Sequence, residues 1–316
     1  DGTKVSESHA GFPMAFYELL GFYQGPALME NSDPAKAATV FGEAAVIASA
    51  KTSSRSLTSL DQRQWRLLEQ YARLEQAKAL LAADNNLAFI ETVEKALSDL
   101  RGLSMKTPHD GYIHYLISIG HHYLAECYRS QKNLQSEYKN LTVEHEQLTV
   151  AINASADPQV RIAWKIARAK SKLRILGFEK RKVDANISEW NSLTESLSAR
   201  ISDLESTANL NADLGWKAPF QQFAETGRKN KNRVVSELVE SLRKLRADNK
   251  SIEEDITTIP STAMQQKEAA PLLLEIKSFG DSVNLSQIQM DSLSKDWNLL
   301  DARMEKLISV QEPITQ

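Results

Sequence analysis

Four stretches of the chain place apolar residues at alternating steps of three and four, which is the heptad spacing of coiled coils. The longest stretch runs from Ile162 to Ala208 and holds fourteen consecutive seam positions, of which only Lys180 and Thr194 are polar. The other stretches run over 113–152, 235–256 and 276–307. A 3.5-residue repeat kept this long holds one face of each helix against a partner and predicts left-handed supercoiling.

The composition agrees with long helices, because Gly (12) and Pro (9) are scarce in 316 residues and other fold classes need more turn residues. We therefore predict an all-α fold: an elongated antiparallel helical bundle or coiled coil of four to five long helices, with a short N-terminal helical cap. More than about 70% of the residues should be helical, against a third in an average globular protein.

Helix starts are marked where a capping side chain precedes a proline, as at Asp33-Pro34, Thr107-Pro108 and Asp157-Pro158. These marks predict long helices over 108–152 and 158–208 and a less regular helix over 58–103 with a break at 84–86. Turns are expected near 153–157, 209–218 and 257–262, so that successive long helices run antiparallel.

The first 52 residues form a predicted domain of their own, and residues 53–316 form the coiled-coil bundle. Residues 11–29 are rich in aromatic side chains, and residues 34–50 form a helix of small residues. One interpretation is a cap docked on the bundle; the other is a segment that leaves the bundle and inserts in a bilayer. No run of 18 apolar residues exists that would form an ordinary transmembrane helix.

Three histidines on one predicted helix, His114, His121 and His122, lie near Glu126 and Cys127 and are the candidate metal ligands. Helical metal sites need ligands four residues apart on one face or Glu-x-x-His pairs on facing helices. His122 and Glu126 are four residues apart, but Ser118, a poor ligand, lies between His114 and His121, and no Glu-x-x-His pair occurs. No phosphate-binding loop, nucleophile elbow or Cys-x-x-Cys pair occurs. We predict no metal, no cofactor and no enzymatic activity.

Residues 161–182 carry nine basic side chains and one acidic side chain, although the net charge of the chain is −3. Either these charges pair with acidic faces of neighbouring helices, or they form a basic face that binds an anionic surface, with membrane headgroups favoured over nucleic acid. The residues predicted for such a face are Arg161, Lys165, Arg168, Lys172, Arg174, Arg181 and Lys182.

Polar residues interrupt the seams mostly at the first position of the heptad, where they fix register and partner number at a cost in stability. Lys180 and Asn249 are the residues predicted to specify register or oligomeric state. The alternative is that these side chains reach solvent at the edge of the seam.

These patterns predict a non-enzymatic helical interaction protein: an adaptor, scaffold or secreted effector. Its expected partners are another protein, a second copy joined through coiled-coil seams, or an acidic membrane. The alternatives are a pore-forming toxin component with 34–50 as its sequestered segment, and a curved membrane-shaping dimer. A chain that begins at Asp1 favours a mature secreted form over a cytoplasmic one.

Overall fold

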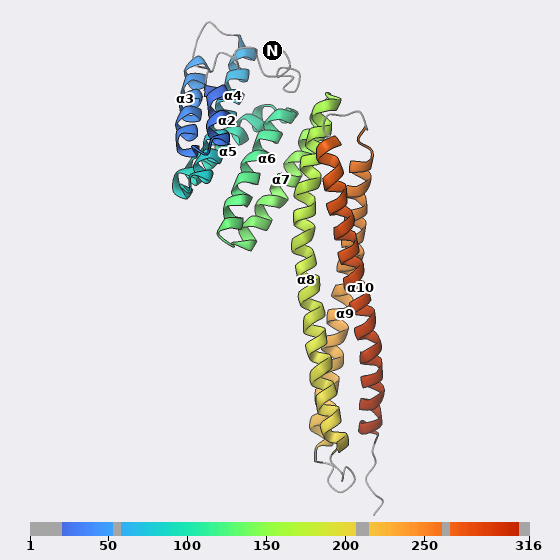
Figure 1. Cartoon of the computed structure of the whole chain (residues 1–316). Coiled ribbons are helices and arrows are strands. Elements are labelled where there is room, and N and C mark those ends of the chain that lie inside the picture. Colours follow the sequence, from blue (N-terminus) through green and yellow to red (C-terminus); the bar gives the residue numbers. More distant parts are fainter. Residues whose placement is uncertain (1–20, 53–57, 207–214, 261–265, 310–316) are drawn as a thin grey trace, which may run out of the picture. The chain divides into compact units, whose positions relative to one another are not determined.

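The computed structural model describes residues 21–52, 58–206, 215–260 and 266–309 (Figure 1). Helices account for 91% of these residues, and the described part contains no strand, so the prediction of an all-α fold is confirmed. The chain divides into two compact units. The first comprises Asp1–Ile175 with Asp255–Ala270, and the second comprises Leu176–Glu254 with Pro271–Gln316.

The first unit contains six helices of moderate length in its described part, each packed against the next along the chain, and α4 also contacts α6. The helices are α2 (Gly21–Glu30), α3 (Pro34–Thr52), α4 (Ser59–Ala82), α5 (Asn86–Lys106), α6 (Gly111–Ser130) and α7 (Leu134–Ala154). The N-terminal part of α8 completes this unit.

One turn recurs three times, between α2 and α3, α4 and α5, and α6 and α7. In each turn a residue with φ of 57–61° follows the first helix, and the next residue caps the second helix through its side chain. Backbone bonds spanning five and three residues close the first helix, which is the Schellman arrangement. The left-handed residues are Ser32, Asp84 and Lys132, and the caps are Asp33, Asn85 and Asn133.

The prediction of one helix over 108–152 is wrong, because the turn at Lys132 divides this segment into the hairpin of α6 and α7. The predicted cap at Thr107 is also wrong. Thr107 ends α5, and Asp110 caps α6 by accepting a hydrogen bond from the Tyr112 backbone N–H. The caps at Asp33 and Asp157 and the break at 84–86 are confirmed.

The core of the first unit lies between α4, α5 and α6, where Leu74, Phe89 and Leu116 are fully buried. The small residues of α3 form a second cluster against α4, and Phe41 of α3 fills the space left by Gly25 of α2, where a Cβ would lie 2.3 Å from the ring. The predicted cap, 1–52, thus contributes α2 and α3 to the first unit. Its first twenty residues lie outside the described residues.

The second unit is formed by parts of three long helices: α8 (Pro158–Ser206), α9 (Lys217–Thr257) and α10 (Gln266–Ile308) (Figure 1). Contacts between side chains define their directions. Glu179 and Glu189 of α8 pair with Lys244 and Arg233 of α9, so these helices are antiparallel. Arg303 of α10 pairs with Glu205 of α8, and Ser286 reaches Asp184, so α8 and α10 are parallel.

The predicted seams face the interior of this unit. Trp190, Leu197 and Ile201 of α8 are fully buried, and the buried residues of α9 and α10 follow the same three-and-four spacing. Some differences are local. Val234 is buried at the start of the α9 seam, and the predicted Val235 is half-buried, as are the predicted seam residues Leu204 and Phe279. The α10 seam residues buried in this unit are Leu272, Ile276, Val283, Ser286, Met290, Leu293, Trp297, Leu300, Met304 and Leu307.

Asn249 lies in this seam, 8% exposed, and its Oδ1 atom accepts no hydrogen bond from any described residue. An unsatisfied buried polar group costs about 1 to 3 kcal/mol. A leucine side chain has a branched shape similar to that of asparagine and contains no polar group. Asn249→Leu should therefore raise the free energy of unfolding of the second unit by about 1 kcal/mol or more. Urea denaturation followed by circular dichroism measures the change, and a lower denaturation midpoint would show that Asn249 is stabilising where it stands.

Candidate functional site

A cleft of about 510 Å³ opens in the first unit between α4, α6, α7 and the N-terminal parts of α8 and α10. Its lining combines aromatic, acidic and basic side chains over apolar residues that include Ile119, Leu148 and Ile166. The charged and aromatic residues that line it are Tyr71, Glu75, Lys78, Tyr115, His122, Tyr123, Glu144, Lys170, Arg174 and Glu268.

Three tyrosines, Tyr71, Tyr115 and Tyr123, form the aromatic part of the lining. The Tyr123 hydroxyl donates a hydrogen bond to Glu75 Oε1 over 3.1 Å. Burial, followed by the charge of Glu75, raises the pKa of Tyr71, Tyr115 and Tyr123 above the usual value near 10. The three phenols therefore stay protonated at neutral pH and act as hydrogen-bond donors and neutral aromatic faces.

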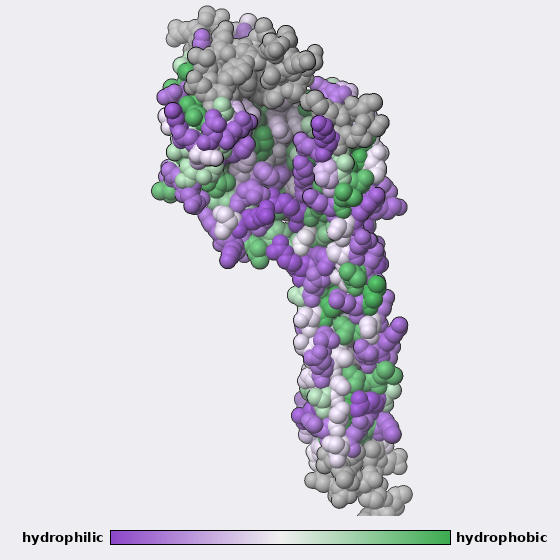
Figure 2. Space-filling view, viewed as in Figure 1, coloured by the Kyte–Doolittle hydropathy of each residue, from purple (hydrophilic) through white to green (hydrophobic). Residues whose placement is uncertain are grey.

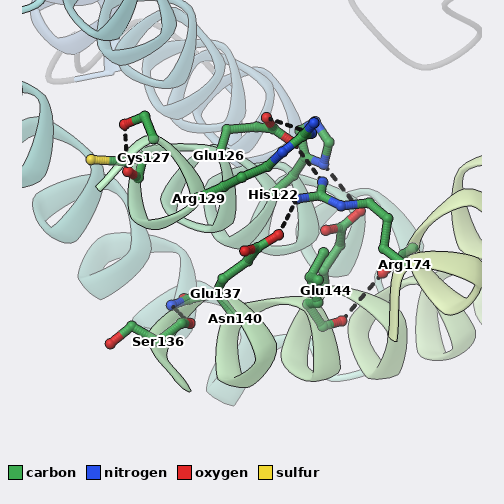
Figure 3. A network of polar contacts seen from close by, with 12 residues as sticks. His122, Glu126, Cys127, Arg129, Ser136, Glu137, Asn140, Glu144 and Arg174 are labelled. Atoms are coloured by element: carbon green, nitrogen blue, oxygen red, sulfur yellow. Dashed lines mark hydrogen bonds and ion pairs between the residues drawn. The ribbon is translucent and has the colours of Figure 1, made fainter. Parts of the chain in front are cut away.

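Arg174 of α8 joins three helices at one edge of the cleft (Figure 3). Its guanidinium group reaches Glu126 Oε1 of α6 at 2.5 Å and Glu137 Oε1 of α7 at 3.1 Å. The Glu137 side chain is only 6% exposed, and the guanidinium group is its partner in an ion pair. A planar guanidinium group with several donors suits this double contact, and it holds α8 against the hairpin of α6 and α7.

Glu144 of α7 lies beside this network and is 7% exposed. Its Oε1 atom is 3.2 Å from His122 Nδ1, whereas its Oε2 atom is buried and receives no hydrogen bond from any described residue. Buried carboxylate oxygens almost always have a donor. The cleft thus holds one acceptor whose donor is missing.

The other two histidines of α6 belong to separate hydrogen-bond pairs. His114 contacts Gln147 Oε1 and the Pro108 carbonyl oxygen. His121 contacts Asn140 Oδ1 at 2.8 Å and Arg101 at 3.2 Å. Within the described part of the chain, no three or more His, Cys, Asp or Glu side chains gather so that they could hold a metal ion.

Burial, aided by Arg101 and Lys139, lowers the pKa of His121 below its usual value near 6.5. Because Arg101 can only donate, the ring accepts at Nε2 and donates from Nδ1, so protonation would place a proton against the guanidinium group. The unfolded chain therefore binds the proton more readily, and folding loses stability as the pH falls below about 6.5.

We expect His121→Gln, which keeps one donor and one acceptor without a titrating ring, to reduce this acid sensitivity. Urea denaturation at pH 7.0 and 5.5 measures it for the wild type and the variant. The wild type should lose more stability than the variant between these two values, and equal losses would contradict the assignment.

The predicted basic face is divided by the structure. Residues 161–175 lie in the first unit, and Arg181 and Lys182 lie in the second. Arg168 pairs with Asp255, Arg174 with Glu126 and Glu137, and Lys170 with Glu268. Arg161, Arg181 and Lys182 are exposed, while Lys165 and Lys172 are half-buried. Binding of an anionic surface by these residues stays a prediction.

Lys180, predicted to specify register, is 19% exposed and pairs with Asp184 one turn further along α8 at 2.8 Å. Asp184 Oδ1 also accepts a hydrogen bond from Ser286 of α10 at 3.0 Å. Lys180, Asp184 and Ser286 therefore link α8 to α10 inside the second unit.

Among the described residues, no helix has the length and the apolar character that a membrane span requires.

Sequence reasoning missed the cleft. Heptad spacing identifies residues that face one neighbouring helix, whereas the cleft draws residues from helices that are far apart in sequence, from Tyr71 to Glu268. The burial of Glu144 could not be predicted from the sequence, because a lone glutamate in a helix is usually a solvated surface residue.

Comparisons of the chain with protein-family models, with curated proteins and with solved structures give no match.

Proposed function

We propose that this protein is a non-enzymatic interaction protein that binds a segment of a partner protein in the cleft of the first unit. The observation that carries the proposal is the buried Glu144 Oε2 atom, which accepts no hydrogen bond from any described residue, in a residue that lines an open cleft. A donor supplied by a bound partner would satisfy it.

The lining favours a basic side chain as that donor. Lysine and arginine donate to carboxylates and also lie against the faces of aromatic rings. Glu144 offers the carboxylate, and Tyr115 and Tyr123 offer neutral rings in the same cleft. Leu148 and Ile166, both buried, supply an apolar floor for the residues beside the basic one.

A partner protein is favoured over an acidic membrane because part of the basic face is already paired with acidic side chains. The ion pairs of Arg168, Lys170 and Arg174 consume charges that would otherwise meet lipid headgroups. The pore-forming alternative loses support for a similar reason, since the small residues of α3 are buried against α2 and α4.

The chemistry of the buried groups also supports a role in binding rather than catalysis. The raised pKa values keep the cleft tyrosines protonated. Cys127 is buried, and burial raises the pKa of its thiol, so little of the reactive thiolate forms at neutral pH.

Selection from a displayed library of random twelve-residue peptides on the immobilised chain tests the proposal. Enriched peptides should share a lysine or arginine next to apolar residues. Their affinity should fall about tenfold or more in Glu144→Gln, because a hydrogen bond to a charged group contributes about 1.5 to 3 kcal/mol.

Glu146→Gln is the matched control, since Glu146 lies on the same helix and is exposed. It should leave peptide binding unchanged. Peptides without a shared basic residue, or equal binding to Glu144→Gln, would contradict the proposal. Sedimentation with acidic liposomes at low salt tests the membrane alternative, and strong binding there would favour the basic face.

A further inference from the structure

The outer face of α10 carries a second apolar stripe, in addition to the seam that it buries in the second unit. Four large apolar side chains on this helix are exposed, by 61% to 69%. Their spacings of eleven, three and eleven residues place all four within about 60° of one another around the helix. The four residues are Leu274, Leu285, Ile288 and Leu299.

The stripe follows heptad spacing along α10, with apolar and polar residues in equal number. Between its apolar residues, steps of three and four pass through exposed Ser278, Asp281, Ser292 and Lys295. At 100° per residue this line lies nearly opposite the buried seam of α10, so the helix has two coiled-coil faces of which the unit covers one. Figure 2 shows hydrophobic residues exposed along this three-helix part of the molecule.

Two copies of the stripe that run antiparallel place apolar residues opposite apolar residues. In an antiparallel coiled coil, first-position residues of one helix pair with fourth-position residues of the other. Centring the pairing between Leu285 and Ile288 places these two opposite each other, and it also places Leu274 opposite Leu299. Each apolar residue then meets an apolar residue, as a two-fold interface requires.

The charges of the stripe fit the same pairing. Asp281 falls one layer from Lys295 of the other helix, within reach of a long lysine side chain, and the two-fold axis produces this contact twice. Within the described residues neither side chain enters an ion pair of its own chain. We propose that α10 pairs antiparallel with α10 of a second copy of this chain through this stripe.

The expected dimer is modest in affinity. The eight apolar side chains of the two stripes together expose on the order of 1,000 Å², near the lower limit for a specific interface. Glu275 and Asp296 meet across the two-fold on one flank and repel each other. A dissociation constant in the micromolar range follows, so the experiment needs concentrations from about 1 to 100 μM.

Sedimentation equilibrium of the full chain tests the proposal. The wild type should dimerise, and the double variant Leu285→Asp and Ile288→Asp should be monomeric over the whole range while keeping its helical circular dichroism, because both side chains are exposed. Val239→Asp, on the exposed face of α9, is the matched control and should dimerise as the wild type does. A monomeric wild type, or dimerisation lost only with Val239→Asp, overturns the proposal.

A charge exchange tests the antiparallel register. Asp281→Lys should weaken the dimer about tenfold or more, because it turns two attractions into repulsions. Adding Lys295→Asp should restore the wild-type dissociation constant. A double variant that stays as weak as the single one overturns the register, and a single variant that dimerises normally does the same.

Discussion

Replacing Arg174 by glutamate is expected to destabilise the first unit by about 3 to 5 kcal/mol, because it leaves a buried carboxylate without its partner. Glu137, 6% exposed, would face a second negative charge in place of a guanidinium group, and Glu126 would lose a contact of 2.5 Å. The α7 and α8 helices would separate at the edge of the cleft, and peptide binding should be lost with the fold of this unit.

Arg161→Glu is the matched control for this variant. Arg161 lies on the same helix and in the same unit, is exposed, and forms no ion pair with any described residue. Its reversal should change the free energy of unfolding by less than about 0.5 kcal/mol. Urea denaturation of both variants gives the comparison, and equal stabilities would show that Arg174 does not hold the helices together.

Trp190→Ala should have an effect of similar size in the second unit. Trp190 is fully buried among α8, α9 and α10, and removing a buried tryptophan side chain usually costs about 3 to 5 kcal/mol. The loss comes from apolar area returned to water and from the cavity that remains. Thermal denaturation measures it, with exposed Val239→Ala as the control that should change little.

Trp190→Phe separates the two contributions of this side chain. The indole Nε1 atom of Trp190 is buried and donates to no described acceptor. Phenylalanine keeps most of the apolar volume and removes this unsatisfied group, so the loss should be clearly smaller than for alanine. A loss as large as that of Trp190→Ala would mean that the indole makes a specific contact.

The three long helices could be predicted from the sequence because a heptad seam depends only on spacing within one helix. The predicted seam residues of α10 from Ile276 to Leu307 are buried, except Phe279, which is half-buried. The turn at Lys132 could not be predicted in the same way. It contains neither glycine nor proline, and the apolar spacing continues in phase from α6 into α7.

The prediction that Thr107 caps a helix is wrong for a different physical reason. A threonine before proline can end one helix as well as begin the next, and here the Thr107 backbone N–H bonds the Leu103 carbonyl oxygen at the end of α5. Asp110, three residues later, supplies the cap. The basic residues of 161–182 are clustered in the sequence, but acidic partners of Arg174 and Arg168 lie on other helices, as Glu126 and Asp255 do.

Cross-linking of a selected basic peptide to the intact chain tests the central claim most directly. The peptide would carry a photoreactive group beside its lysine or arginine, and mass spectrometry would locate the attachment points. We expect cross-links on α4, α6 and α7 around Tyr71, Tyr123 and Glu144, which are lost in Glu144→Gln and kept in Glu146→Gln. Cross-links concentrated on the parts of α9 and α10 that belong to the second unit, or unchanged in Glu144→Gln, would contradict this expectation.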